Sequence, residues 1–571
     1  MRSCHSKPPL QHPLFAPVLL IGIIIAVYFP AMQSSIHPYD DPGIISRYSK
    51  SLPLSEVLLP GNSYYYRPLV ESSFWLDNHL WGMIPSAMHL ENILLHCMNS
   101  LLVYLLACKL PDKDNKNRLI PLLAALLFAL HPVNVEAVAW IAGRTDPLLA
   151  LFVLSATYFW IRWLKAPDWR DMFATLVLFG AALLTKETAL AFGGVIALLT
   201  LAWPGTANVR QRISAVIMMA APALLLLGFF LIFKSGNNGV SRFISDTSLQ
   251  PLQEIQMAVT AFGFYLKKLI IPVPLNFAIH IVHPHYVFAG TLFFPLMWWG
   301  LHRQRQASIL LIAATFFILP AVMIAIKPVA WTPFAERYLY VPSALFMVSL
   351  TCICSNTSIA TRKILTVIAI SSATIFAVIS LQRVLLWNDK LAFFEDAVAK
   401  SPQFGSVHYT LGGILAQKGK FNRASEAFTT AERLNQRDSM RYPIKAAIMG
   451  TKIVRGELFE ARGYFFETFT KKEHASADFL ELLFKADNKR LVKLDNTQKK
   501  ILAADILETL DLLHQKRPDP FWLYQSGHMA LIMGNQTKAA DFFRRAYTEA
   551  PTDAHYRGAA LTYIRRLEQC K

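Results

Sequence analysis

Long apolar segments alternate with short polar loops over the first two thirds of the chain. A helix needs about 20 predominantly apolar residues to cross a bilayer, and fewer when it is tilted or irregular. The pattern therefore predicts an all-α, polytopic membrane protein with about eleven spans. The predicted spans cover residues 13–30, 89–108, 119–131, 147–164, 171–185, 188–203, 213–233, 286–301, 307–326, 338–355 and 363–381.

The basic residues of the short loops predict how the spans are oriented. Lys and Arg collect in every second loop, and such loops stay on the cytoplasmic side. The basic loops are 109–118, 165–170, 210–212, 302–305 and 362–363. The first apolar segment is not followed by a small-residue cleavage site, so we expect an uncleaved span with a cytoplasmic N-terminus. The extracytoplasmic side then receives residues 31–88, 132–146, the turn at Lys186, 234–285, 327–337 and everything after about residue 382.

The apolar segment 255–272 would reverse this alternation if it crossed the membrane. Lys267 and Lys268 lie inside it, and charged side chains are costly within a bilayer. We therefore expect this segment to be interfacial or re-entrant.

The composition agrees with a membrane protein, since 54% of the residues are hydrophobic and only 16% are charged. The formal charge of +18 raises the question of nucleic-acid binding. The Lys and Arg residues are spread over loops and the C-terminal third, without a basic stripe interleaved with aromatic residues. We therefore expect contacts with membrane lipid and none with nucleic acid. The six cysteines have neither the pattern of a disulfide framework nor the spacing of a zinc site.

The hydrophobic pattern changes abruptly at Trp387, where the chain becomes charged and much less apolar. This change predicts two domains. The first is a transmembrane domain, residues 1–386, with a first external loop at 31–88. The second is a soluble, helical, extracytoplasmic domain, residues 387–571.

Two segments of the second domain, 405–434 and 521–551, have glycine, alanine and phenylalanine at the same offsets. These are the small and aromatic positions of tetratricopeptide helix pairs. We expect a third, degenerate pair at 442–471, further helices at 472–518 and a capping helix at 553–568. Such an α-solenoid would bind a protein partner or serve as a stability module.

Charged side chains collect near the membrane on the predicted extracytoplasmic side. The first external loop contains the adjacent acids Asp40 and Asp41 and the cation Arg67. The later loops add His131, Glu136, Arg144, Asp146, Lys186, Glu187, Glu336 and Arg337. Cations and acids on one face of a bundle suit a phosphorylated lipid, because Arg grips phosphate with two hydrogen bonds and Lys acts as a point charge. Taken one at a time, these charged residues have plainer interpretations. They could belong to a solvated loop, anchor a helix at the membrane interface, or form an ion pair between Lys186 and Glu187.

The order of these groups resembles that of a known family. The blocks are Asp40-Asp41, Tyr66-Arg67-Pro68-Leu69, His131-Pro132 with Glu136, Gly143-Arg144 with Asp146, Lys186-Glu187, and Ala335-Glu336-Arg337-Tyr338. Followed by repeats, this order is similar to that of the transmembrane and tetratricopeptide-repeat-containing O-mannosyltransferases, which are relatives of the protein O-mannosyltransferases in the GT-C class.

The resemblance implies transfer of a sugar, typically mannose, from a polyprenyl-phosphate carrier to a Ser or Thr hydroxyl on the extracytoplasmic side. It places the catalytic acid in the first external loop, at Asp40 with Asp41 beside it. The repeat domain would then be periplasmic in a bacterial inner membrane, or lumenal in the endoplasmic reticulum. The acceptor, protein or glycan, stays open.

The implied chemistry gives these residues roles. An attacking hydroxyl needs a carboxylate to take its proton, and we assign that role to Asp40. The leaving lipid phosphate needs charge stabilisation rather than a proton, from Arg67, Arg144, Lys186 or Arg337. A single direct displacement would invert the anomeric centre. Asp41 or Glu136 would position the acceptor, orient Asp40 or hold a divalent cation such as Mg²⁺ or Mn²⁺, and the sequence leaves these open.

Other classes of protein also combine many spans with external repeats. An O-antigen polymerase or ligase, or an oligosaccharyltransferase-like enzyme, would use a glycan on a lipid pyrophosphate, with its key Arg and His in one large late loop. A transporter is disfavoured because the sequence has no inverted repeats with charged residues inside paired spans. A non-catalytic scaffold would tolerate neutralisation of Asp40.

Overall fold

The computed structural model describes residues 14–50, 52–59, 66–110, 118–234, 250–327, 331–435 and 437–569 of the chain. Within these residues the structure consists of helices and connecting loops, apart from one isolated antiparallel bridge between Ile279 and Phe334. The all-α prediction is therefore confirmed. The chain divides into two compact units, Met1–Ser401 and Pro402–Lys571. Helix α19 (Lys390–Lys400) follows the border that we predicted after residue 386 and falls in the first unit.

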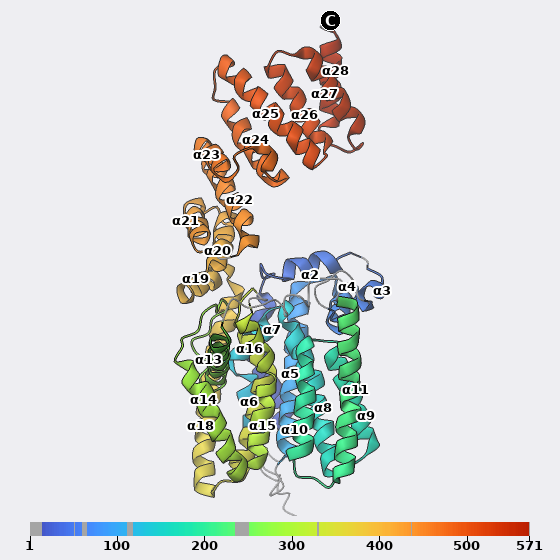
Figure 1. The fold of residues 1–571 in the computed structure, drawn as a ribbon, viewed down its shortest axis with the longest axis vertical. Helices are drawn as coiled ribbons and strands as arrows, with labels where there is room; N and C mark the ends of the chain where they lie inside the picture. The colour runs from blue at the N-terminus through green and yellow to red at the C-terminus, as the bar shows by residue number, and fades with distance from the viewer. Residues whose placement is uncertain are drawn as a thin grey trace, which may run out of the picture. The chain divides into compact units, whose positions relative to one another are not determined.

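The first unit is a bundle of long helices that run side by side (Figure 1). A helix lies over each predicted span. These helices are α1 (Phe15–Tyr28), α5 (Pro85–Lys109), α6 (Leu119–Ala129), α8 (Thr145–Lys165), α9 (Trp169–Leu183), α10 (Leu190–Ala202), α11 (Val209–Lys234), α14 (Tyr286–Arg303), α15 (Arg305–Phe316) with α16 (Leu319–Ile326), α17 (Tyr340–Ser355) and α18 (Ile359–Asn388).

Six helical segments in the described part of the chain are long and apolar enough to cross a membrane. They are Phe15–Gln33, Pro85–Lys109, Ala142–Lys165, Arg305–Ile326, Glu336–Ser355 and Ile359–Asn388. The pair Leu119–Ala129 and Pro132–Ala139, bent by 47°, makes a seventh if it counts as one span. The chain is therefore a multi-pass membrane protein. Helix α13 (Pro251–Ile270), over the segment predicted to be interfacial, is not among these candidate spans.

Short elements connect the long helices. They are η2 (Phe29–Gln33), α2 (Asp41–Tyr48), α3 (Leu54–Leu58), α4 (Pro68–Trp81), η3 (Pro132–Asn134), α7 (Val135–Ala139), η4 (Ala142–Arg144), η5 (Glu187–Ala189) and η6 (Glu336–Leu339). Helices α2, α3, α4 and α7 lie toward the same end of the bundle (Figure 1). Local sequence sets several boundaries, since Pro68 and Pro85 begin α4 and α5, where proline needs no hydrogen-bond partner.

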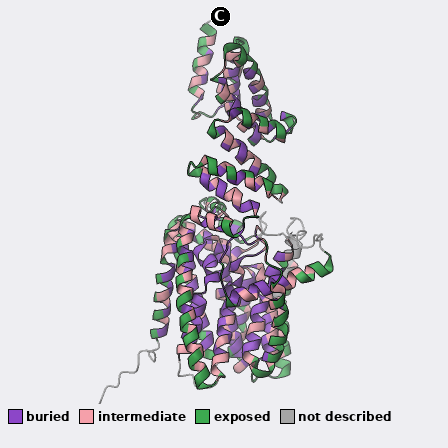
Figure 2. Cartoon of the chain, turned by 90° about the vertical axis from the view of Figure 1, so that its left-hand side faces the viewer, coloured by how far each residue is buried: buried purple, intermediate pink, exposed green. Residues whose placement is uncertain are grey.

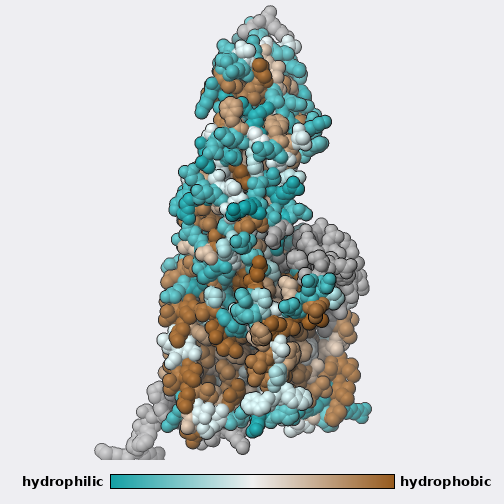
Figure 3. All heavy atoms as spheres, turned by 60° about the vertical axis from the view of Figure 1, so that its left-hand side comes forward, coloured by the Kyte–Doolittle hydropathy of each residue, from teal (hydrophilic) through white to brown (hydrophobic). Residues whose placement is uncertain are grey.

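The bundle carries apolar side chains on its outside. Buried residues gather between the helices and exposed ones along their outer faces (Figure 2), yet those outer faces include Trp298, Ile364 and Val367, which are 71%, 61% and 63% exposed. Hydrophobic residues cover much of the visible face of the bundle, whereas hydrophilic residues predominate on the repeat unit (Figure 3). An apolar exterior suits a lipid environment and would be a liability in water.

The second unit is built from successive helix pairs. They are α20 (Gly405–Gln417) with α21 (Phe421–Arg433), α22 (Asp438–Arg455) with α23 (Leu458–Thr468), α24 (Ala477–Leu491) with α25 (Asn496–Lys516), and α26 (Pro520–Ile532) with α27 (Gln536–Glu549), followed by α28 (Arg557–Gln569). A Cβ atom at Gly412 would lie 2.6 Å from the ring of Phe428, and one at Gly527 would lie 2.6 Å from the ring of Phe543. The same glycine–phenylalanine contact closes the first and last pairs, which confirms the predicted tetratricopeptide-like repeats.

Candidate active site

Asp40 lies in a strained turn immediately before α2. Its backbone has φ 58° and ψ −44°, and the NH of Asp41 donates to the Tyr39 carbonyl at 2.6 Å. A residue with positive φ that is enclosed by such an i to i+2 bond is the centre of the rare, strained kind of γ-turn. Non-glycine residues hold strained backbone only where their surroundings enforce it, and they cluster at functional sites. The Asp40 side chain is exposed and has no hydrogen-bond partner among the described residues.

The neighbouring Asp41 has a different environment, because its side chain is buried. One carboxylate oxygen accepts from the NH of His37 at 2.8 Å, and the other accepts from the NH of Ala142 at 3.1 Å. Burial raises the pKa of Asp41 to about 7 and outweighs these hydrogen bonds, which lower it. Asp41 thus fixes the turn, while Asp40 is presented outward.

The imidazole of His37 anchors this turn in an aromatic cluster. Its ring lies between 5.0 and 5.8 Å, centroid to centroid, from the rings of Phe277, Trp387, Phe393, Phe394, Trp140 and Tyr39. Burial lowers the pKa of His37 to about 3, so the imidazole is neutral at physiological pH. The cluster draws on α18, α19 and the chain after α7, and it packs the base of the turn.

Two arginines act electrostatically on Asp40. Although the Asp40 side chain is exposed, the surrounding protein partly removes its hydration and so raises its pKa, while the positive charges of Arg337 and Arg67 lower the pKa. Arg67 immediately precedes α4, and Arg337 belongs to η6. Residues distant in sequence therefore place an exposed carboxylate beside two guanidinium groups.

Each of these arginines is paired with a glutamate. The Arg67 guanidinium donates two hydrogen bonds to Oε2 of Glu187, from Nε at 3.1 Å and from Nη2 at 2.7 Å. Arg337 is paired with Glu136, which also accepts from the backbone NH groups of Glu336 and Arg337 at 3.1 and 3.3 Å. Both arginines are held in place by carboxylates from other elements.

Lys186 is buried and pairs with Asp146 at 2.6 Å. Its Nζ lies 5.5 Å from the ring of Tyr338, which follows Arg337. Lys186 and Glu187 therefore bond to different residues, and the plainer interpretation of an ion pair between these two does not describe the structure.

Glu336 points away from this set, toward α13. Its carboxylate lies 2.6 Å from Nζ of Lys268 and accepts from the NH of Asn276 at 3.0 Å. Sequence reasoning treated Lys268 only as a sign of an interfacial segment. In the structure the Lys268–Glu336 pair is buried and ties the end of α13 to η6, the element that carries Arg337.

Arg144 and His131 lie in the interior. The Arg144 guanidinium is 2.7 Å from Asp77 and 3.0 Å from Glu91, and Arg144 is 1% exposed. The His131 Nε2 bonds to the Leu269 carbonyl at 3.0 Å. Both side chains connect segments of the bundle. Their contact with a lipid phosphate stays a prediction from the sequence.

Sequence reasoning missed a polar stripe along α5. Arg144 donates to Asn92, His96 bonds to the Tyr340 hydroxyl at 2.7 Å, and Asn99 donates to the Pro147 carbonyl at 2.8 Å. These α5 residues recur at intervals of four and three in an otherwise apolar segment, a signal of one buried polar face. Charge is conspicuous in the loops, whereas these neutral polar residues lie inside a predicted span.

The two acids proposed as cation ligands do not fit a divalent ion. Both oxygens of Asp41 accept backbone NH groups, and Glu136 is occupied by Arg337 and two backbone NH groups. The described residues contain no group of three or more His, Cys, Asp or Glu side chains arranged for a metal. Mg²⁺ prefers several free oxygen ligands, which these carboxylates do not supply.

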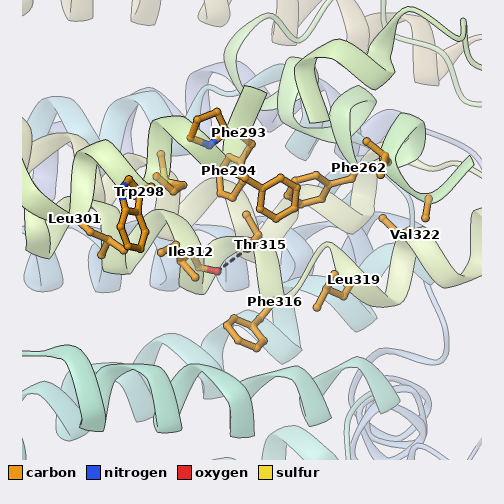
Figure 4. A pocket seen from close by; sticks show the side chains of 14 residues that line it. Phe262, Phe293, Phe294, Trp298, Leu301, Ile312, Thr315, Phe316, Leu319 and Val322 are labelled. Atoms are coloured by element: carbon orange, nitrogen blue, oxygen red, sulfur yellow. Dashed lines mark hydrogen bonds between the residues drawn. The ribbon is translucent and has the colours of Figure 1, made fainter. Parts of the chain in front are cut away.

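An apolar cavity of about 870 Å³ opens between α13, α14, α15 and α16 (Figure 4). Phe262, Trp298 and Val322 are among its lining residues, and the hydroxyl of Thr315 donates to the Ile312 carbonyl at 2.7 Å. Phe262 and Val322 also belong to the hydrophobic cluster that contains Leu339 of η6. Packed side chains therefore connect the wall of the cavity with η6, the element that carries Arg337.

The sequence is similar to known glycosyltransferases. Residues 69–233 match the family model described as dolichyl-phosphate-mannose-protein mannosyltransferase. The Drosophila melanogaster protein O-mannosyl-transferase Tmtc1 is 38% identical over 130 residues, which are 23% of this chain and 15% of that protein. A Caenorhabditis elegans protein O-mannosyl-transferase, F38B6.6, is 26% identical over 388 residues, 65% of this chain and 54% of that protein. The predicted resemblance is confirmed.

The similarity to this O-mannosyltransferase family covers only part of this chain and part of each relative. The human TMTC3 protein O-mannosyl-transferase matches at 37% identity over 23% of this chain and 14% of its own length, and the chain spans about half or less of the relatives named here. The family model includes Glu136, Lys186 and Glu187 but not Asp40 or Arg337. Among solved structures, yeast Tom70 covers 79% of this chain at 12% identity with a TM-score of 0.19, too low to bear on the fold.

Proposed function

We propose that this protein is a membrane glycosyltransferase that moves mannose from a polyprenyl-phosphate donor to a Ser or Thr hydroxyl of a protein. The observation that carries the proposal is the exposed carboxylate of Asp40, presented by a strained turn beside Arg67 and Arg337. The similarity to proteins named O-mannosyl-transferases supports mannose as the sugar and protein as the acceptor.

Asp40 acts as the general base. The acceptor hydroxyl gives its proton to the Asp40 carboxylate while its oxygen attacks the anomeric carbon, and the bond from that carbon to the phosphate oxygen breaks. A raised pKa makes a carboxylate a stronger base, provided that it is ionised at the working pH. Because this is one displacement, the configuration of the anomeric carbon is inverted.

The cations around Asp40 stabilise the departing polyprenyl phosphate. Once the donor is bound, the positive charges of Arg67, Arg337 and Lys186 are fixed in place, and charge that needs no reorganisation during the reaction is the most effective form of electrostatic catalysis. The leaving phosphate is weakly basic, so it takes no proton. Asp41 is a positioning residue that holds the turn through His37 and Ala142.

The apolar cavity between α13 and α16 accommodates a part of the prenyl chain beyond the first isoprene units, which a short-chain donor lacks. Its apolar lining, and the packing of its wall in the same hydrophobic cluster as Leu339 of η6, support this assignment. Val322→Trp should raise the KM for a long-chain donor and leave that for a short-chain donor unchanged, whereas Ile364→Trp on the exposed face of α18 should change neither. Equal effects of Val322→Trp on both donors would exclude the cavity as the chain site.

The active site and the repeat unit both lie on the extracytoplasmic side, where the repeats hold the acceptor protein. Impermeant thiol labelling of a cysteine introduced at Glu56 in α3, and of one introduced at Ile501 in α25, tests this topology in intact cells. Both positions are exposed. Both cysteines should react from outside, and protection of either one would contradict the assigned side.

Transfer of labelled mannose tests the function itself. Purified full-length protein in nanodiscs is given synthetic polyprenyl-phosphate mannose and a Ser/Thr-containing protein acceptor. We expect a mannosylated product with the anomeric configuration opposite to that of the donor. Retention of configuration would exclude the single displacement, and transfer only from a pyrophosphate-linked glycan would favour a ligase-type enzyme.

A further inference from the structure

The ion pairs formed by Arg67, Lys186 and Arg337 differ in how accessible they are. In the Lys186–Asp146 pair the side chains are 8% and 7% exposed, and in the Arg337–Glu136 pair they are 18% and 3% exposed. Arg67 and Glu187 are the most accessible, at 21% and 33%. The Arg67–Glu187 pair is therefore the one that an incoming anion reaches most easily.

The acids also differ in how firmly they are held. Glu136 accepts two backbone NH groups as well as the Arg337 guanidinium, so its displacement would leave buried donors unpaired. Glu187 is the first residue of η5, its carboxylate accepts from Nε and Nη2 of Arg67, and its side chain is 33% exposed. Glu187 can leave that guanidinium by side-chain rotation without breaking a helix.

The backbones on either side of this pair stay together when the side chains separate. The NH of Leu69, two residues after Arg67, donates to the Leu184 carbonyl at 3.3 Å. Arg67 is thus held beside the turn between α9 and η5 independently of its ion pair. Exchange of its anionic partner therefore leaves this backbone contact in place.

A carboxylate and a phosphate compete for the same guanidinium fork. Arg67 places Nε and Nη2 at 3.1 and 2.7 Å from one Glu187 oxygen, and a phosphate ester binds such a fork with the same pair of donors. In the pairs described above, each cation is matched by one acid. A donor phosphate that approached Asp40 would therefore meet cations that are already neutralised.

We propose that Glu187 occupies the phosphate position on Arg67 in the absence of donor and is displaced when a lipid-borne phosphate ester binds. Glu187 is then a specificity-determining residue that competes with the ligand and sets the donor affinity. The inference rests on the proposed function for the identity of the donor. The competition between an acid and a phosphate for Arg67 does not depend on that identity, because a binding measurement without any sugar transfer tests it.

Binding of unglycosylated polyprenyl phosphate to the full-length protein in nanodiscs is the direct test. Glu187→Gln removes the competing charge, so we expect about fivefold tighter binding, the scale of one partly exposed ion pair. Arg67→Gln should bind more weakly, and adding Glu187→Gln to Arg67→Gln should give no further gain. Glu56→Gln, at an exposed acid of α3, is the matched control and should bind like the wild type.

Further measurements separate this idea from its alternatives. Glu187→Asp keeps the negative charge on a shorter side chain, so it should not bind polyprenyl phosphate as tightly as Glu187→Gln does. This variant controls for structural effects of any substitution at position 187. Inorganic phosphate in competition shows whether the headgroup alone is recognised or the lipid chain is also required. Unchanged or weaker polyprenyl phosphate binding by folded Glu187→Gln would overturn the inference, even if the wild type transfers mannose. Tighter binding without any mannose transfer would support the competition and reject the proposed function.

Discussion

The backbone NH of Ala142 donates a hydrogen bond of 3.1 Å to the carboxylate of Asp41, across 101 residues of chain. This bond joins the turn that presents Asp40 to the start of η4. Because the same carboxylate also accepts from His37, one buried side chain holds the strained turn from two directions. The geometry of the base therefore depends on a neighbour that does not face the substrate.

Asp41→Asn should lower kcat about 10- to 100-fold, since small misplacements of a reacting group have effects of this size. The asparagine keeps one acceptor oxygen, but its amide group faces a backbone NH that then has no partner. The donor KM should change little, because no phosphate contact is lost. Steady-state kinetics at varied donor concentration measure both values, and a wild-type kcat would remove the positioning role.

Activity should fall as the pH drops through the range in which Asp40 and Asp41 take up protons. Burial raises the pKa of Asp40 above its usual value and that of Asp41 to about 7. Protonated Asp40 cannot accept the hydroxyl proton, so the active form is the ionised one at higher pH. We expect kcat/KM to fall as the pH drops below about 7, where Asp41 takes up a proton, and to fall further as Asp40 is protonated. In a pH profile of Asp41→Asn the step near pH 7 should be absent.

Arg144 and Arg337 should respond differently to substitution. Arg144 and Asp77 are each 1% exposed as a pair, so Arg144→Gln leaves a buried acid unpaired and should destabilise the fold by about 3–5 kcal/mol. Arg337→Gln should lower kcat about 100- to 1,000-fold, as does loss of other groups that stabilise transition-state charge. Thermal unfolding in detergent and transfer assays at matched protein levels distinguish the two. A folded but inactive Arg144→Gln protein would instead place Arg144 in the phosphate site.

Two adjacent glycines of α20 offer a matched pair of substitutions in the repeat unit. A Cβ at Gly412 would meet the Phe428 ring at 2.6 Å, whereas nothing lies within 4 Å of one at Gly413. Gly412→Ala should destabilise the helix pair by about 1–3 kcal/mol through overpacking. Gly413→Ala should stabilise it by up to about 1 kcal/mol, the difference in helix propensity. Hydrogen exchange of α20 and α21 in the full-length chain reports both, and equal effects would contradict the packing.

The sequence predicted the helical architecture well because apolar run length and the spacing of glycine and phenylalanine are local signals. The repeat pairs follow from residues such as Gly412 and Phe428 that are 16 positions apart and touch. The location of Asp40 in a loop after the first span also followed from local pattern. The predicted site residues Arg67, Glu136, Lys186, Glu187 and Arg337 all belong to ion pairs in the structure.

The partners of these residues could not be read from the sequence. Arg67 pairs with Glu187 across 120 residues, and Lys268 pairs with Glu336 across 68. Such contacts depend on which helices pack together, and many acids were equally available. The γ-turn at Asp40 has no sequence signal either, because a non-glycine residue adopts it only under constraint from the fold.

The account rests on Asp40 as the base, and one comparison tests it most directly. Mannose transfer from polyprenyl-phosphate mannose is measured for the wild type, Asp40→Asn and the control Glu56→Gln, all as folded full-length protein in nanodiscs. We predict that Asp40→Asn loses at least about 1,000-fold in kcat while it still binds polyprenyl phosphate, and that Glu56→Gln is unchanged. Transfer by Asp40→Asn at the wild-type rate would contradict the central claim.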